Sequence, residues 1–136
     1  MIAILTACYK RHDIFKLFLN SLPKDVYLIC VGSEDENLTA FNDRKIKGTY
    51  LIHENKPLGK KWNAGLSYAK QIDFDYLLVS GSDDIFCQDL WAWYKTVSVH
   101  YAGLLDMYFM DYATGKVKYN EGFKAYRRGE PLFKGA

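Results

Sequence analysis

The sequence predicts an α/β fold in which helices cover both faces of a mostly parallel sheet, a three-layer α/β/α arrangement. Short runs of consecutive apolar residues recur along the chain, and such runs are typical of strands buried on both faces of a parallel sheet. The segments between them carry apolar residues at helical spacing, and alternating strands and helices form parallel sheets. With 136 residues the chain has the length of one domain, so we expect a single domain over 1–136.

The four predicted strands are the runs of apolar residues in the first two thirds of the chain. They lie at residues 2–8, 26–31, 49–53 and 76–79. The first run is too short for the apolar core of a signal peptide and follows no basic region, so we interpret it as a strand. The second run ends in the polar loop 32–37.

Helices are predicted where the apolar spacing changes to that of one helix face. The first covers about 14–22, after Asp13, which suits a cap or first turn, and before Pro23, which ends it. A second is predicted over about 59–71 and a third over about 89–100.

The last third of the chain predicts a β-hairpin rather than another crossover. Residues 104–112 form a strand-like run, Thr114 and Gly115 form a turn, and a second short strand follows at 116–119. We therefore expect the sheet to be mixed. From 121 to 136, glycine and charged residues dominate and no periodicity is left.

The composition excludes several classes of protein. The formal net charge is +2, whereas proteins that bind nucleic acids or anionic membranes need a large basic surplus. No apolar stretch approaches the roughly 18 residues of a membrane span, so we expect no transmembrane segment. The three cysteines are widely spaced and form no CxxC pair, which favours small buried residues in a reducing cytoplasm.

Polar residues gather in the loops that follow the predicted strands, where open α/β sheets bind their ligands. In the last of these loops, Asp83 and Asp84 come directly after a buried strand, beside the small residues Gly81 and Ser82. Adjacent carboxylates repel each other unless a cation or donors compensate, and Mg²⁺ or Mn²⁺ bound together with phosphate oxygens is a usual solution. In the alternative interpretation, one aspartate caps the next helix and the other is solvated.

Basic residues in two other loops suit a phosphate ligand. Lys60 and Lys61 lie at the start of a predicted helix, where free N–H groups and the helix dipole already favour an anion. Arg11, after the first strand, is a similar candidate. The alternative is that all three are solvated surface residues. The chain contains no GxGxxG, no GxxxxGK[ST] and no GxSxG motif.

Four segments in this order resemble the nucleotide-sugar-binding half of the family 2 glycosyltransferases, which have the GT-A fold. They are IAILTACYKR at 2–11, VGSED at 31–35, NKPLGKKWNAG at 55–65 and YLLVSGSDD at 76–84. The resemblance covers about residues 2–86 and implies a donor-binding part there, with 87–136 as an incomplete acceptor side. Two features depart from the family's pattern. Gly81 stands in place of the first Asp of its Asp-x-Asp motif, and Cys30 and Val31 stand where a base-reading Asp is common.

The resemblance implies roles for individual residues. The nucleoside would lie against Thr6, Ala7 and Tyr9, with Ser33, Glu34 and Asp35 bordering the base. The phosphates would lie near Arg11, Lys60, Lys61 and Asn63, beside the small residue Ser82. Asp83 and Asp84 would bind Mn²⁺ or Mg²⁺.

The family's catalytic base is a carboxylate that deprotonates the acceptor hydroxyl in an inverting displacement. Five carboxylates follow the metal motif, and no spacing singles out one of them: Asp89, Asp106, Asp111, Glu121 and Glu130. The resemblance thus implies a transferase that moves a sugar from a nucleoside-diphosphate sugar, with a UDP-sugar favoured, to a carbohydrate or other hydroxyl acceptor. Because the acceptor side is short, a homo-oligomer or a partner chain is expected to complete it.

Two other functions remain open from the sequence. The first is a non-catalytic module that binds a nucleotide sugar, alone or with a partner chain. The second is a nucleotidyltransferase of related architecture, although such an enzyme needs a glycine-rich loop after its first strand, and none is present here.

Overall fold

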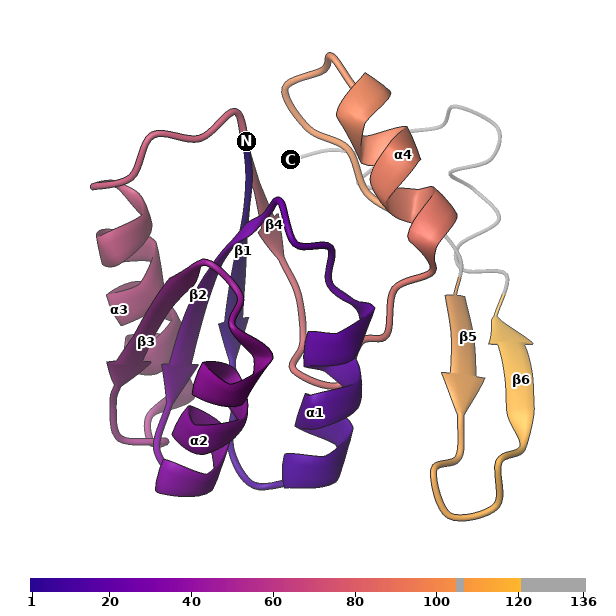
Figure 1. Ribbon diagram of the computed structural model, residues 1–136, viewed down its shortest axis with the longest axis horizontal. Helices are drawn as coiled ribbons and strands as arrows, with labels where there is room; N and C mark the ends of the chain where they lie inside the picture. The colour runs from indigo at the N-terminus through magenta and orange to yellow at the C-terminus, as the bar shows by residue number, and fades with distance from the viewer. Residues whose placement is uncertain (105–106, 121–136) are drawn as a thin grey trace, which may run out of the picture. The chain divides into compact units, whose positions relative to one another are not determined.

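A computed structural model of the chain describes residues 1–104 and 107–120 (Figure 1). The chain separates into two compact units, Met1–Thr96 and Val97–Ala136. The donor-binding range expected from the resemblance, 2–86, falls entirely within the first unit. In the part of the chain described, no helix is long and apolar enough to cross a membrane.

The first unit is an α/β structure built on a four-stranded sheet. Its strands are β1 (Ile2–Ala7), β2 (Tyr27–Gly32), β3 (Gly48–Ile52) and β4 (Tyr76–Val79). They lie in the order β3-β2-β1-β4, and every neighbouring pair is parallel. The helices are α1 (His12–Ser21), α2 (Asp35–Arg44), α3 (Leu58–Ala69) and α4 (Gln88–Thr96). The four strands and three of these helices were expected, and their bounds differ from the expected ones by only a few residues.

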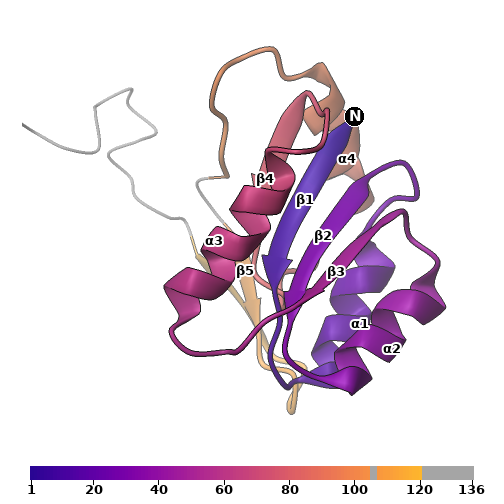
Figure 2. The ribbon, with the colours of Figure 1, turned by 90° about the vertical axis from the view of Figure 1, so that its left-hand side faces the viewer.

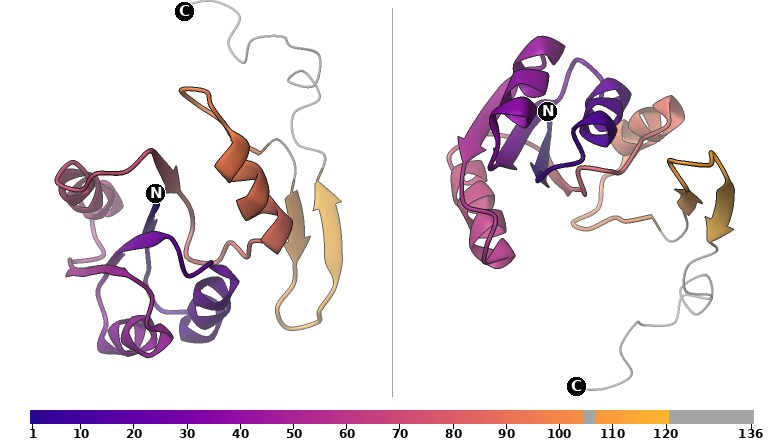
Figure 3. Two further views of the ribbon diagram at one scale, coloured as in Figure 1. Left: turned by 45° about the horizontal axis from the view of Figure 1, so that its top comes forward. Right: turned by 90° about the horizontal axis from the view of Figure 1, so that it is seen from below.

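Helices cover both faces of the sheet. Alternate strand residues point to opposite faces and pack in two separate hydrophobic cores. On one face, Ile4 and Leu28 pack with aromatic residues of α1 and α2 and with Trp91 of α4. On the other face, Leu5 and Ile29 pack against α3. Figure 2 shows α3 on one side of the sheet and α1 and α2 on the other, and the right-hand view of Figure 3 shows the same layers from below.

Gly65 lets α3 pack directly on the sheet. A β-carbon at this position would lie 2.3 Å from Leu5 Cδ1 and 2.9 Å from Val31 Cγ2, well inside normal contact distances. The glycine therefore fixes how closely the helix approaches β1 and β2 and, with it, the position of the loop that precedes α3.

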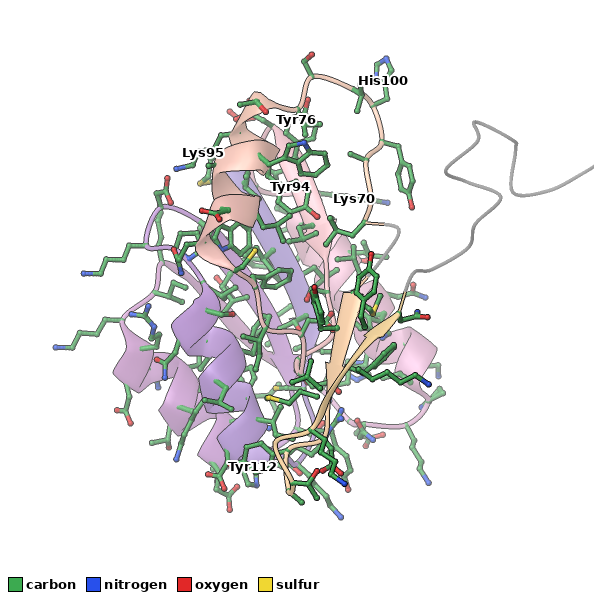
Figure 4. All side chains as sticks on the ribbon, turned by 90° about the vertical axis from the view of Figure 1, so that its right-hand side faces the viewer. Lys70, Tyr76, Tyr94, Lys95, His100 and Tyr112 are labelled. Carbon is green, nitrogen blue, oxygen red and sulfur yellow. The ribbon has the colours of Figure 1, made fainter. Side chains whose placement is uncertain are left out.

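Within the first unit, α4 packs against the preceding elements through both its apolar and its charged side chains. The Trp91 indole N–H donates to the Ser21 carbonyl at 3.2 Å, and the Trp91 ring is buried. Tyr94 and Lys95 follow on the same helix (Figure 4), and the Lys95 ammonium pairs with Asp25 at 2.6 Å. The first turn of α4 thus holds Asp89 in an exposed position within this unit.

The second unit contains the predicted hairpin, with β5 (Met107–Met110) antiparallel to β6 (Val117–Asn120). Its bend holds Tyr112 (Figure 4) and is organised by Asp111, whose carboxylate accepts the N–H groups of Ala113 and Thr114. Gly115 adopts a φ of +68°, which glycine allows without strain, so the predicted Thr114–Gly115 turn is confirmed.

Two sequence-based expectations about the fold are wrong. The sheet is not mixed, since among the described strands the hairpin pairs only with itself and the four-stranded sheet is wholly parallel. The polar loop expected at 32–37 ends early, because α2 begins at Asp35. This helix buries only Asn37, Ala40 and Phe41, so its sequence carries too few apolar residues to show helical periodicity.

Candidate functional site

The strand order creates a topological switch point between the carboxyl ends of β1 and β4. From β1 the chain adds β2 and then β3 on one side, and it then crosses the sheet through α3 to place β4 on the other side of β1. The helices that follow the first strands and the helix that precedes β4 thus lie on opposite faces. Ligands of open α/β sheets bind at such a switch point. The lower ends of β1 and β4 in Figure 1 mark its place.

An ion pair connects the loops on the two sides of this switch point. The Arg11 guanidinium, in the loop after β1, lies 2.7 Å from an Asp83 carboxylate oxygen in the loop after β4. Both side chains are about half exposed, so the pair is worth roughly 0.2–1 kcal/mol. A bound anion and cation would therefore separate the two side chains easily.

The backbone of the β1 loop is strained where it presents Arg11. Lys10 and Arg11 have φ values of 53° and 50°, a left-handed conformation that residues other than glycine rarely adopt. The Lys10 N–H donates to the Glu34 carboxylate at 2.7 Å, which holds the loop in this shape. Strain of this kind is concentrated at ligand-binding sites.

Asp83 and Asp84 fold over Gly81. One oxygen of Asp84 accepts the Gly81 N–H at 2.8 Å and the Ser80 hydroxyl at 3.1 Å. A β-carbon on Gly81 would lie 2.8 Å from Asp83 Oδ1 and 3.2 Å from Asp84 Oδ2. The glycine found in place of the family's first Asp therefore leaves the space that these two carboxylates occupy.

The two carboxylates suit a hard divalent cation. Oδ1 of each side chain makes no hydrogen bond with the described residues, so it is free to bind a cation. Mg²⁺ is typically bound by one or two carboxylates together with substrate phosphates and water. Within the described residues, no group of three or more His, Cys, Asp or Glu side chains is placed to hold a metal. The remaining ligands would therefore come from the substrate and water.

Lys60 and Lys61, adjacent in the sequence, have opposite surroundings. The Lys61 side chain is fully buried, and its ammonium donates to the Cys8 carbonyl at 2.5 Å, Ser33 Oγ at 2.8 Å and Asn55 Oδ1 at 3.2 Å. Burial lowers the pKa of this ammonium. Lys60 is exposed, and its ammonium has no partner in the part of the chain described. A phosphate could thus meet Lys60 directly, whereas it would have to replace a protein acceptor at Lys61.

Side chains of the loop after β2 form hydrogen bonds with the loops that follow β1 and β3 and with α3. The Ser33 hydroxyl donates to the His53 carbonyl at 2.7 Å while it accepts the Lys61 ammonium. The Glu34 carboxylate accepts the Lys10 N–H and the Asn37 side-chain amide, and Asp35 is exposed at the start of α2.

The remaining predicted donor-site residues differ in exposure. Thr6 is fully buried, and its hydroxyl has no hydrogen-bond partner among the described residues. Ser82 is also buried, Ala7 is half-buried and Asn63 is exposed. The Tyr9 ring is 40% exposed, and the ammonium of Lys61 lies 5.8 Å from its centre.

Three residues that the sequence analysis did not single out support the site. Asn37 is fully buried, although amides rarely are, and its Oδ1 lies 2.9 Å from His12 Nδ1. Asn55 accepts the Lys61 ammonium. No local pattern marks these residues, because their contacts arise only where segments far apart in the sequence meet.

The described catalytic candidates are Asp89 and Asp111. Asp89 is exposed at the start of α4. Asp111 belongs to the hairpin bend, where hydrogen bonds from Thr114 and Ala113 lower the pKa of its carboxyl group. Asp106, Glu121 and Glu130 lie outside the described residues.

Comparison with known proteins assigns no family to this arrangement. A scan against protein-family models finds no match, and a search of curated proteins finds none either.

Proposed function

We propose that the chain is a glycosyltransferase that binds a nucleoside-diphosphate sugar, preferentially a UDP-sugar, at the switch point between β1 and β4 and transfers the sugar to an acceptor hydroxyl with the help of Mn²⁺ or Mg²⁺. The observation that carries this proposal is the Arg11–Asp83 pair at the switch point of the sheet. The pair supports the proposal because a guanidinium can bind phosphate and a carboxylate can bind a divalent cation, and both lie at the edge where this kind of sheet binds ligands.

Each side chain at the switch point has a role in binding the donor. The Arg11 guanidinium and the exposed Lys60 ammonium bind phosphate oxygens and offset the charge that develops on the leaving diphosphate. Asp83 and Asp84 hold the divalent cation, and the Ser80 hydroxyl and the Gly81 N–H keep Asp84 in place. When bound, the cation adds Lewis-acid stabilisation of the leaving group.

Transfer also requires a carboxylate that accepts the proton of the acceptor hydroxyl. Asp111 is poorly suited, because its carboxylate is held by the hairpin bend and its lowered pKa makes it a weaker base. Asp89 is the remaining candidate in the described part of the chain. Asp106, Glu121 and Glu130 stay candidates on the sequence alone.

The hydrogen bonds that hold the Asp111 carboxylate also favour a second candidate function, a non-catalytic module that binds a nucleotide sugar and acts alone or with a partner chain. The two functions share the donor site and differ in what happens after binding. Release of nucleoside diphosphate from a bound UDP-sugar, by transfer or by slow hydrolysis, distinguishes the transferase from the module.

The test is the binding of UDP-, GDP- and CDP-sugars with Mn²⁺, screened by thermal shift and measured by calorimetry. A ligand that binds only the folded state raises the melting temperature. We expect Asp83→Ala to weaken Mn²⁺-dependent binding at least about tenfold, which corresponds to about 1.4 kcal/mol. Asp43→Ala is the matched control, because Asp43 is an exposed aspartate near the C-terminal end of α2, outside the Asp83–Asp84 loop. Equal binding by both variants would show that the carboxylate pair is not the metal site.

A further inference from the structure

Two buried thiols lie side by side where β1 and β2 end, and the proposed donor site uses neither of them. Cys8 Sγ and Cys30 Sγ are 3.4 Å apart, and the two residues are 1% and 0% exposed. Cys30 lies within β2, and Cys8 directly follows β1, with its N–H bonded to the Val31 carbonyl. The two sulfur atoms are therefore in direct contact. The third cysteine, Cys87, is exposed.

The surroundings of the two sulfur atoms differ. The hydrogen bond with Cys30 lowers the pKa of the Cys8 thiol, and the Tyr50 hydroxyl and the Lys61 ammonium add to this effect, while burial opposes it. Burial raises the pKa of the Cys30 thiol. Tyr50 OH lies 3.7 Å from Cys8 Sγ and can turn its hydrogen from the Glu34 carbonyl, 3.2 Å away, toward a thiolate. Cys8 is thus the better nucleophile and Cys30 the neighbouring thiol.

We propose that Cys8 and Cys30 are a redox-active pair that a hydroperoxide converts into an intramolecular disulfide. The Cys8 thiolate attacks the peroxide, the O–O bond breaks, and a sulfenic acid forms while the peroxide leaves as its alcohol or, for hydrogen peroxide, as water. The Cys30 thiol then attacks the sulfenic sulfur, an S–S bond forms, and water carries away the hydroxyl group and the thiol proton. The two thiols together lose two electrons, and the peroxide gains them.

The position of Cys8 couples this reaction to the buried Lys61, and this coupling does not depend on the proposed function. An S–S bond is about 2.05 Å long, so the two sulfur atoms must approach each other. Cys30 is fixed by ladder partners in both β1 and β3, whereas Cys8 leads into the exposed residues Tyr9, Lys10 and Arg11. Cys8 therefore makes most of the movement. Its carbonyl is an acceptor of the buried Lys61 ammonium, so oxidation disturbs that contact.

The experiment uses the full-length Cys87→Ser chain, so that the exposed thiol cannot take part. The folded protein is treated with hydrogen peroxide, thiols are then blocked, and tryptic peptides are analysed without reduction. We expect a cross-link between peptides 1–10 and 25–44, a mass loss of two hydrogen atoms and the loss of both titratable thiols. Dithiothreitol should reverse all three changes. If both thiols survive peroxide that fully oxidises glutathione in the same tube, the proposal is wrong.

Two further variants in the Cys87→Ser background assign the roles. With Cys30→Ser, Cys8 should still react and be trapped by a sulfenic-acid reagent such as dimedone. With Cys8→Ser, Cys30 should remain a free thiol. If Cys30 is the residue that reacts with dimedone, the assigned order of attack is overturned. If a cross-link forms only after unfolding in urea, the native pair is not redox-active.

Amine labelling tests the link to the site. In the reduced chain the exposed Lys60 should react with an acetylating reagent and the buried Lys61 should not. After oxidation we expect Lys61 labelling to rise while Lys60 labelling, the internal control, stays constant. Unchanged labelling of Lys61 in the cross-linked chain would overturn the proposed coupling.

Discussion

At the scale of single residues, the surroundings of a side chain decide its role more than its type does. Lys60 and Lys61 have the same chemistry and lie next to each other at the start of α3. A helix turns about 100° per residue, so one points to solvent and the other into the junction of the strand ends. The buried ammonium donates to three acceptors, the Cys8 carbonyl, Ser33 Oγ and Asn55 Oδ1.

These surroundings predict opposite effects for the two lysines. Lys60→Ala should weaken binding of a nucleoside diphosphate more than that of the nucleoside and change the free energy of unfolding by less than about 0.5 kcal/mol. Lys61→Met should lower the free energy of unfolding by about 2–3 kcal/mol, because its acceptors lose their donor. Urea denaturation and calorimetry measure the two quantities. If Lys60→Ala weakens nucleoside and nucleoside diphosphate equally, Lys60 does not contact the phosphates.

Thr6 and Gly81 show how neighbouring groups change the meaning of a motif residue. Thr6 matches the family pattern, yet its hydroxyl is buried and unpaired among the described residues. Gly81 departs from the pattern, yet its lack of a side chain makes room for both carboxylates. A motif read from the sequence thus marks a position, and packing sets the side chain's surroundings there.

At the scale of elements, apolar content decides which ones the sequence reveals. The strands of the sheet and α1 and α3 bury many apolar side chains and are predictable. α2 exposes most of its surface and was missed. The hairpin was predicted from its turn, but the expectation that its strands make the main sheet mixed was wrong, because a strand's sequence does not specify which sheet it joins.

The contact between α3 and the sheet supplies a prediction for this scale. Gly65→Ala should lower the free energy of unfolding by about 1–3 kcal/mol, because the added methyl group overlaps the side chains of Leu5 and Val31. Urea denaturation checks the value. Gly59→Ala is the control, since a β-carbon there meets nothing within 4 Å. Equal stability of the two variants would mean that α3 does not pack this closely.

For the molecule as a whole, buried titratable groups predict its response to alkaline pH. Burial raises the pKa of Cys30 above its ordinary value of 9.0 and is the main cause that raises the pKa of Tyr50 above 10.0. Above these values the unfolded chain loses protons that the folded chain keeps, so the folded state binds more protons. The contribution of these two groups to the free energy of unfolding then falls as the pH rises, whereas the lowered pKa values of Cys8 and Lys61 contribute in the opposite direction.

We therefore expect the contribution of Cys30 and Tyr50 to the free energy of unfolding, measured in urea, to decrease from pH 8 to pH 11. Tyr50→Phe removes one of the responsible hydroxyl groups and should make the decrease shallower above pH 10, although it also loses the hydrogen bond to the Glu34 carbonyl. Tyr101→Phe is the control, because that tyrosine is 90% exposed. A slope unchanged by Tyr50→Phe would contradict the assignment.

The sequence by itself determined the strands, most of the helices and the loops that carry the polar residues. These features depend on local spacing and composition, which a linear sequence contains. From them it follows that Arg11, Ser33, Lys60 and Asp83 all lie near carboxyl ends of parallel strands, which was enough to propose a phosphate and metal site.

Only the tertiary structure decided which of these residues meet. Placing β4 beside β1 brought Arg11 to Asp83, although 72 positions separate them in the chain. The packing of α3 against the ends of β1 and β2 buried Lys61, and the pairing of β1 with β2 brought Cys8 Sγ next to Cys30 Sγ. Strand order, burial and thiol contact all arise from interactions between segments far apart in sequence. The physical reason is that an apolar run specifies that a strand is buried but leaves open which strands lie beside it.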